Sequence, residues 1–160
     1  MKQKQIILPS WLENKFIVLI GLMGAGKTRL GRILSESLKL PFIDTDIEIE
    51  KAAGLTIEEI FDNFGETYFR NGEQKVINRV LNGEPSILAT GGGAFMNSIT
   101  RKEIEKFGIS IWLRADINLL VKRTESRSGR PLLKNGNPRE ILTKLMKERY
   151  PVYSKADIVF

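Results

Sequence analysis

Short apolar runs recur along this chain and alternate with longer segments in which apolar residues return every three or four positions. Short apolar runs bounded by polar or turn-forming residues are typical of buried strands, whereas the longer spacing is typical of amphipathic helices. The predicted strands are residues 16–20, 41–43, 86–89, 109–113 and 157–160, and the segment 29–39 behind the first of them is a predicted helix.

Several predicted helices begin with residues that cap helix N-termini. Such residues accept hydrogen bonds from backbone N–H groups that have no partner inside the helix. The predicted starts are Thr56 with Glu59, Thr100 with Glu103, Asp116 (capping a helix through Lys122), and Asn137 with Pro138 and Glu140. The two Thr–Glu pairs have the spacing of a capping box.

Strands and helices therefore alternate from one end of the chain to the other. This order is typical of a mostly parallel sheet with helices on both faces, and 160 residues suit a single domain. Ligands of such sheets bind outside the carboxyl ends of the strands. We therefore expect the residues that directly follow each strand to meet around one site.

Residues 21–28, Gly-Leu-Met-Gly-Ala-Gly-Lys-Thr, follow the first predicted strand and match the phosphate-binding pattern Gly-x-x-x-x-Gly-Lys-Ser/Thr. The glycines let backbone N–H groups converge on phosphate oxygens, and the next helix adds its positive N-terminal end. Lys27 is expected to reach the β- and γ-phosphates and Thr28 to ligate Mg²⁺. The alternative is a glycine-rich turn that only joins strand to helix. Because chance matches are rare in so short a chain, we predict nucleotide binding.

Composition limits both the class of ligand and the residues available for proton transfer. The net charge of +6 is spread without a dense basic run, which suits small anionic ligands better than a nucleic acid. The chain has neither histidine nor cysteine, so proton transfer falls to a carboxylate, a lysine, a tyrosine or water. Its longest apolar run is too short for a membrane span. We expect a cytoplasmic monomer with no membrane or nucleic-acid partner.

Acidic residues and glycines follow the second and third predicted strands. Asp44 and Asp46 are two residues apart, so an extended segment would point both carboxylates the same way. One carboxylate is then suited to hold Mg²⁺ through water and the other to face the phosphoryl acceptor, with helix capping as the alternative. Gly91, Gly92 and Gly93 favour close approach of the backbone to an anion, with a flexible strand exit as the alternative.

Arginines supply candidate sites for anionic groups. Arg70 and Glu73 share a face of a predicted helix beside Phe69, which suits a clamp for a small carboxylate or, alternatively, a surface ion pair. Residues 124–137 mix arginine, glycine, serine and proline, as in a mobile lid that would bring Arg130 over a phosphoryl group; a solvated basic loop is the alternative. Arg149 ends a predicted helix, where it would bind substrate or cap carbonyl groups.

Taken together and in order, these motifs resemble the shikimate kinase family. The likeness rests on the phosphate loop, Asp44-x-Asp46, Gly-Glu-x-x-Phe-Arg at 65–70, the glycine triplet, Arg-Pro-Leu-Leu at 130–133 and Arg149 in Arg-Tyr-Pro-x-Tyr. It covers residues 14–160 and leaves 1–13 as an N-terminal extension. The resemblance implies a single-domain, three-layer α/β fold of the P-loop NTPase type, with a five-stranded parallel sheet flanked by helices. It also implies transfer of the γ-phosphoryl group of MgATP to the 3-hydroxyl of shikimate, in aromatic amino-acid biosynthesis.

The resemblance assigns expected roles residue by residue. Lys27, Asp46 and Arg130 would be catalytic, with Asp46 gripping the reacting hydroxyl and both cations steadying the phosphoryl group. Thr28 would bind Mg²⁺, with Asp44 behind a water molecule. The expected nucleotide-binding residues are Gly24, Ala25, Gly26, Lys27, Thr28, Arg29, Arg123 (stacking near the adenine) and Arg130. The expected shikimate-binding residues are Asp46, Phe61, Phe69, Arg70, Glu73, Gly91, Gly92, Gly93 and Arg149.

Two departures from the family pattern accompany the resemblance. The family usually continues past its last strand, whereas this sequence ends at Phe160, and Arg29 stands where many relatives have a small hydroxyl residue. We expect the Arg29 side chain to face away from the phosphates. One alternative function is a P-loop kinase for gluconate or nucleoside monophosphates, which leaves residues 65–70 and Arg149 without a purpose. The other is a non-catalytic nucleotide-binding module, which does not explain why Asp46 and Arg130 are present.

Overall fold

The computed structural model describes residues 8–127 and 129–160. Residues 1–7 of the predicted N-terminal extension and Ser128 of the predicted lid lie outside the described residues. The described strands are β1 (Phe16–Ile20), β2 (Phe42–Asp44), β3 (Ile87–Ala89), β4 (Gly108–Trp112) and β5 (Ile158–Val159). They form one parallel sheet in the order β2-β3-β1-β4-β5. Each predicted strand overlaps an observed one, so the predicted parallel sheet is confirmed.

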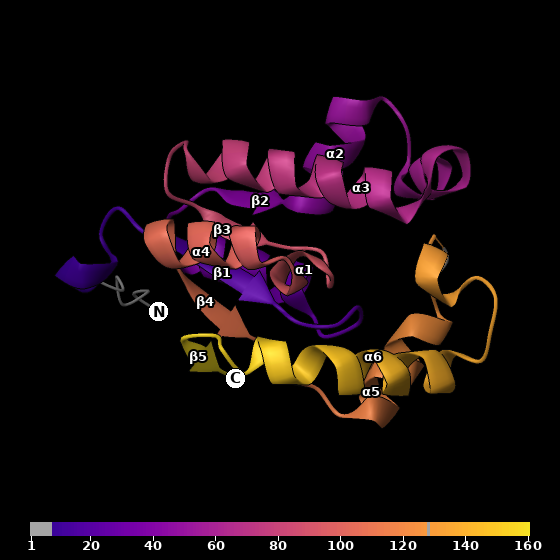
Figure 1. The fold of residues 1–160 in the computed structure, drawn as a ribbon. Coiled ribbons are helices and arrows are strands. Elements are labelled where there is room, and N and C mark those ends of the chain that lie inside the picture. The colour runs from indigo at the N-terminus through magenta and orange to yellow at the C-terminus, as the bar shows by residue number, and fades with distance from the viewer. Residues whose placement is uncertain (1–7, 128) are drawn as a thin grey trace.

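Helices cover both faces of this sheet, giving three layers (Figure 1). The helices are α1 (Lys27–Leu38), α2 (Thr45–Ala53), α3 (Ile57–Leu81), α4 (Ser98–Phe107), α5 (Ile117–Glu125) and α6 (Pro138–Tyr153), with single 3-10 turns η1 (Ser10–Leu12), η2 (Ala94–Met96) and η3 (Pro131–Leu133). Residues of α1 pack on one face, and residues of α3, α4, α5 and α6 pack on the other. Over the described part of the chain, no helix combines the length and apolarity that crossing a membrane requires.

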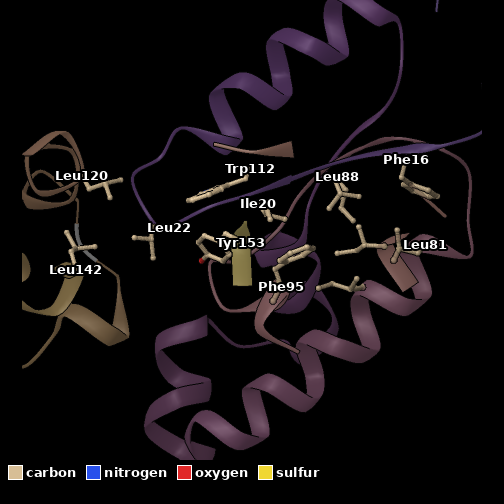
Figure 2. Close-up of a cluster of buried hydrophobic side chains, with 14 of the residues drawn as sticks. Phe16, Ile20, Leu22, Leu81, Leu88, Phe95, Trp112, Leu120, Leu142 and Tyr153 are labelled. Atoms are coloured by element: carbon tan, nitrogen blue, oxygen red, sulfur yellow. The ribbon is translucent and has the colours of Figure 1, made fainter. Parts of the chain in front are cut away.

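The central strand β1 shows why the sheet is buried on both sides. Phe16, Val18 and Ile20 join the main core cluster, whereas Ile17 and Leu19 join the smaller cluster against α1. All five side chains are at most 5% exposed. Burying a side chain of this size contributes about 1.5–3 kcal/mol, so β1 is a major source of stability. Figure 2 shows the main cluster, in which Tyr153 and Trp112 lie among aliphatic side chains.

Most predicted helix caps are confirmed, and one is wrong. The confirmed caps are Thr56 with Glu59 on α3, Asp116 on α5, and Asn137 with Pro138 on α6. Thr100 and Glu103 do not start a helix, because Asn97 caps α4 further upstream. The Asn97 side-chain oxygen accepts hydrogen bonds from the backbone N–H groups of Ile99 at 2.9 Å and Thr100 at 3.2 Å. Asparagine caps at least as well as threonine, so the earlier residue begins the helix.

A kink divides α3. Gly65 has φ 84° and ψ 174°, which is not helical, so the helix is interrupted at this residue. The two halves still pack together, since the rings of Phe61 and Phe69 are 4.8 Å apart. A second cluster of buried side chains packs α3 against α2, and Figure 1 shows the two helices side by side.

Candidate active site

The phosphate loop links the carboxyl end of β1 to α1. Gly24 and Gly26 have φ values of 83° and 101°, in the left-handed region that favours glycine, and Gly26 is the N-cap of α1. Leu22 is 1% exposed and joins the main core cluster, which anchors the loop (Figure 2). The predicted strand, glycine turn and helix are confirmed. This geometry is the one that binds phosphate at a helix N-terminus.

Lys27, the first residue of α1, turns back over the loop. Its Nζ donates hydrogen bonds to the carbonyl oxygens of Gly21 at 2.7 Å and Leu22 at 3.0 Å. Burial lowers the pKa of Lys27 to about 8, against the opposing effect of the Asp46 carboxylate. Arg130 adds to the lowering because it is a second positive charge nearby. An anion placed among these groups would stabilise the ammonium and raise this pKa again, so the site favours phosphate.

Asp44 connects the phosphate loop to the second strand. Its Oδ2 accepts a hydrogen bond from the Thr28 hydroxyl at 3.0 Å, and its Oδ1 accepts one from the backbone N–H of Asp46, also at 3.0 Å. Asp44 is thus the N-cap of α2, and the extended segment expected for residues 44–46 is wrong because the helix begins at Thr45. The helix-capping alternative therefore applies to Asp44. Its Oδ1 caps α2, and its Oδ2 is hydrogen-bonded to the Thr28 hydroxyl.

Asp46 nevertheless faces the same cavity as Asp44. Burial raises its pKa, the neighbouring Asp44 carboxylate raises it further, and Lys27 opposes the shift. A carboxylate with a raised pKa accepts a proton more readily near neutral pH. Asp46 therefore has the position and the basicity expected of a group that receives a hydroxyl proton.

A cavity of about 820 Å³ lies at the carboxyl ends of β2 and β3. It is lined by the phosphate loop, the start of α1, both aspartates and the first two glycines of the triplet. Arg123, Arg127 and Arg130 line it from the lid side. Arg29, expected to face away from the phosphates, also lines this cavity. The prediction that segments following different strands meet at one site is confirmed.

Arg70 marks a second, acidic and aromatic wall beside this cavity. Its guanidinium pairs with Glu73 at 3.0 Å and with Glu66 at 3.2 Å, and lies over the ring of Phe69 at 5.1 Å. Glu73 is 3% exposed, and its second carboxylate oxygen has no hydrogen-bond partner among the described residues. Burial raises the pKa of Glu73, and Arg70 opposes that shift. Glu73 is buried and Arg70 is 26% exposed, so this ion pair is partly buried, and its service as a carboxylate clamp stays a prediction.

The glycine triplet, residues 91–93, is where the two walls meet. A Cβ on the first glycine would lie 2.7 Å from Oε2 of Glu73 and 3.2 Å from Oδ1 of Asp46. A Cβ on the second would lie 2.9 Å from a guanidinium nitrogen of Arg149, and one on the third would overlap the Arg70 guanidinium. Side chains from α2, α3 and α6 thus converge on one turn. The space around the triplet is therefore filled by these side chains, so the triplet is not a flexible strand exit.

Arg149 brings a buried positive charge to this turn. It lies on α6 and is 6% exposed, yet no carboxylate of residues 8–127 and 129–160 lies within salt-bridge distance of it. Tyr153, one turn later, donates a hydrogen bond to the carbonyl oxygen of Gly92. Burial raises the pKa of Tyr153 to about 12, so its hydroxyl remains a donor. A buried guanidinium without a carboxylate partner is suited to an anionic ligand.

Further arginines, from the end of α5 and from residues 124–137, line the cavity beside the phosphate loop. Arg123 Nη1 donates hydrogen bonds to the carbonyl oxygens of Gly24 at 3.1 Å and Ala25 at 3.2 Å, so the end of α5 is joined to the phosphate loop. Its stacking near an adenine stays a prediction. Arg130 lines the cavity, where burial and then the charge of Arg127 lower its pKa. An anion bound between these groups would oppose both effects, because it stabilises the charged guanidinium.

Sequence reasoning gave no role to three residues that hold this site together. Glu66 pairs with Arg70, Tyr153 fixes the glycine turn, and Lys134 joins the lid to α3. The i, i+4 spacing of Glu66 and Arg70 was a usable signal. The contacts of Tyr153 and Lys134 join segments that are far apart in the chain, so no local sequence pattern predicts them.

Comparison with known proteins identifies the family. The shikimate kinase family model matches residues 23–160. The chain belongs to the shikimate kinase family. A shikimate kinase of Paramagnetospirillum magneticum is 57% identical over 146 residues, which cover 91% of this chain and 75% of the relative. A shikimate kinase of Mesorhizobium japonicum is 51% identical over 92% of this chain and 72% of the relative.

Solved structures of this family share the fold. A shikimate kinase from Acinetobacter baumannii in complex with shikimate is 39% identical, with a TM-score of 0.89 over 95% of this chain and 87% of that one. A shikimate kinase from Bacteroides thetaiotaomicron gives a TM-score of 0.85 at 31% identity, over 91% of this chain and 85% of that one. The P-loop kinase fold implied by the sequence motifs is therefore confirmed.

Proposed function

We propose that this chain transfers the γ-phosphoryl group of ATP to the 3-hydroxyl of shikimate, giving shikimate 3-phosphate and ADP. The observation that carries the proposal is the meeting of a phosphate loop and a buried arginine pocket at the glycine triplet, with Asp46 between them. Membership of the shikimate kinase family supports the same acceptor. The reaction belongs to aromatic amino-acid biosynthesis.

The chain's own residues supply positioning and charge. Asp46 would accept the proton of the attacking hydroxyl, which its raised pKa favours. Lys27 and Arg130, which both line the cavity, would neutralise the charge on the oxygens of the transferring phosphoryl group. Phosphoryl transfer depends mainly on such alignment and neutralisation, so the lack of histidine is no obstacle.

Mg²⁺ is the metal that this donor set fits. Thr28 and Asp44 place a hydroxyl and a carboxylate oxygen 3.0 Å apart in the cavity wall, and both are oxygen donors of the kind Mg²⁺ prefers. No cluster of three carboxylates that would hold a metal by itself occurs in the described part of the chain. Thr28 would therefore bind the ion directly and Asp44 through water, with nucleotide phosphates completing the set. The bound ion would neutralise β- and γ-phosphate charge.

The acceptor would lie with its carboxylate at Arg70 and Arg149. Arg149 has no carboxylate partner in the described residues, and Arg70 would add its guanidinium from α3. Phe61 and Phe69 would cover the apolar side of the ring, and Glu73 would hold Arg70 in place. The unpartnered oxygen of Glu73 would then accept a hydrogen bond from a hydroxyl of the acceptor.

The remaining expectations become part of the proposal. The proposed nucleotide-binding residues are those of the phosphate loop with Arg29, Arg123 and Arg130, and the proposed kinase domain spans residues 14–160 after an extension over 1–13. Because the partners are two small molecules, we propose a cytoplasmic monomer that needs neither membrane nor nucleic acid. Light scattering coupled to size exclusion should give one chain mass near 18.1 kDa.

A coupled assay of ADP release tests the acceptor. Shikimate, gluconate and nucleoside monophosphates are compared at matched concentrations with MgATP. We expect turnover with shikimate and only background release with the others. Preferential turnover of another acceptor would replace shikimate in the proposal, and nucleotide binding without turnover of any acceptor would point to a non-catalytic module.

A further inference from the structure

Lys134 follows η3 inside the lid and connects the lid to α3. Its Nζ is 3.0 Å from Oε1 of Glu58 and 3.3 Å from Oδ2 of Asp62. The two carboxylates are one helical turn apart, so a single ammonium joins both. The hydrogen bonds to Glu58 and then Asp62 raise the pKa of Lys134, which therefore stays charged. Figure 1 shows this part of the lid, in orange, extending toward the start of α3.

The turn that carries Lys134 also carries Arg130. The carbonyl oxygen of Arg130 accepts a hydrogen bond from the backbone N–H of Leu133 at 3.0 Å, and that of Pro131 accepts one from Lys134 at 3.3 Å. The segment from the cavity-lining arginine to the lysine is thus one hydrogen-bonded turn. Fixing Lys134 at one end of this turn restrains Arg130 at the other.

On the other side of the contact, Glu58 and Asp62 flank Phe61, which packs on Phe69 in the wall of the proposed acceptor pocket. The ion pairs therefore join the nucleotide side of the site to the acceptor side. Building on the proposed function, we propose that Lys134 is a positioning residue. Its ion pairs with Glu58 and Asp62, the lid latch, hold the lid against α3 and keep Arg130 at the point of phosphoryl transfer.

Coupled substitutions test the kinetic role of the lid latch. Lys134→Met and the double variant Glu58→Gln/Asp62→Asn should each lower kcat/KM about three- to tenfold, because exposed ion pairs are individually weak. Their combination should be no worse than either alone, since both remove the same contact. Lys134→Arg should restore activity. Lys144→Met is the matched control, because Lys144 pairs only weakly with Glu148 on its own helix, at 4.0 Å. Additive losses, or an unchanged kcat/KM in both variants, would overturn the proposal.

Trypsin provides a readout that needs no turnover. Glu58→Gln/Asp62→Asn leaves every lysine and arginine in place, so all cleavage sites are unchanged. If the lid latch holds the lid, cleavage after the exposed Arg127 should accelerate about threefold or more in this variant, while cleavage after Lys102 on α4 should not change. If the wild-type chain and the double variant are cleaved after Arg127 at the same rate, the lid latch is refuted. A wild-type chain that fails to phosphorylate shikimate would instead sink the proposed function, whatever the cleavage result.

Discussion

Protonation of Lys27 should control nucleotide binding. Burial against the loop carbonyls lowers its pKa to about 8, so the free site holds a readily deprotonated amine. Phosphate oxygens attract the ammonium and not the neutral amine, so nucleotide binds the protonated form and raises the pKa. Affinity should therefore be highest below pH 8 and fall as the pH rises above it.

The expected size of the effect follows from the pKa. For a pKa of about 8, roughly 0.9 of Lys27 is protonated at pH 7 and roughly 0.1 at pH 9. If the nucleotide-bound pKa returns to its ordinary range, the dissociation constant of ADP should rise about tenfold between these pH values, which is about 1.4 kcal/mol. The chain has no histidine or cysteine, so few other groups titrate in this window.

Calorimetry measures both the affinity and the protons taken up. ADP is titrated across this pH range in buffers of different ionisation enthalpy, and the wild-type chain should take up close to one proton near pH 9. The control is Lys27→Arg, whose guanidinium stays charged throughout, so its affinity should hardly change with pH. Constant wild-type affinity up to pH 9, or the same pH dependence in the arginine variant, would refute the assignment to Lys27.

Three further predictions address catalysis, acceptor binding and packing. Asp46→Asn should lower turnover at least about a hundredfold in steady-state kinetics while ADP affinity stays within about threefold, and a parallel loss of affinity would contradict its role. Arg70→Lys should raise the shikimate KM about tenfold, because an ammonium cannot form a two-pronged contact, and an unchanged KM would remove Arg70 from the clamp. Gly31→Ala should lower the free energy of unfolding by about 1–3 kcal/mol, since its Cβ would overlap the Phe42 ring. Gly72→Ala is the control, because an added Cβ at this helical position has nothing within 4 Å, and it should raise the free energy of unfolding by about 0.5–1 kcal/mol. Similar denaturant midpoints for Gly31→Ala and Gly72→Ala would refute the packing argument.

The strands and the phosphate loop could be predicted because their signals are local. A buried strand such as β1 is a continuous apolar run, and the loop glycines that adopt positive φ follow it directly. Convergence of Asp46 and the glycine triplet followed from a rule of parallel sheets, that ligands gather at the carboxyl ends. The roles of Arg70 and Arg149 came from resemblance to a family, since spacing alone left a surface ion pair and a helix cap open.

What could not be predicted depends on tertiary contacts or on competing local signals. Asn97 caps α4 in place of Thr100, and because both residue types cap well, the sequence offered two competing starts for this helix. Gly65 kinks α3 at a position that helical periodicity treated as ordinary. Lys134 reaches its partner Asp62 across 72 residues, and a lone lysine in a basic loop gives no sign of its partner.

At the glycine triplet, the need for glycine comes from the neighbouring side chains and not from the backbone conformation. None of these glycines has φ in the left-handed region, so the backbone itself would accept alanine at each position. An alanine Cβ would instead come too close to the charged side chains of the site, among them Asp46, Arg70 and Arg149. These neighbours are the ends of charged side chains, not a ring as at Gly31, so alanine there should displace the charged groups of the site more than it unfolds the chain.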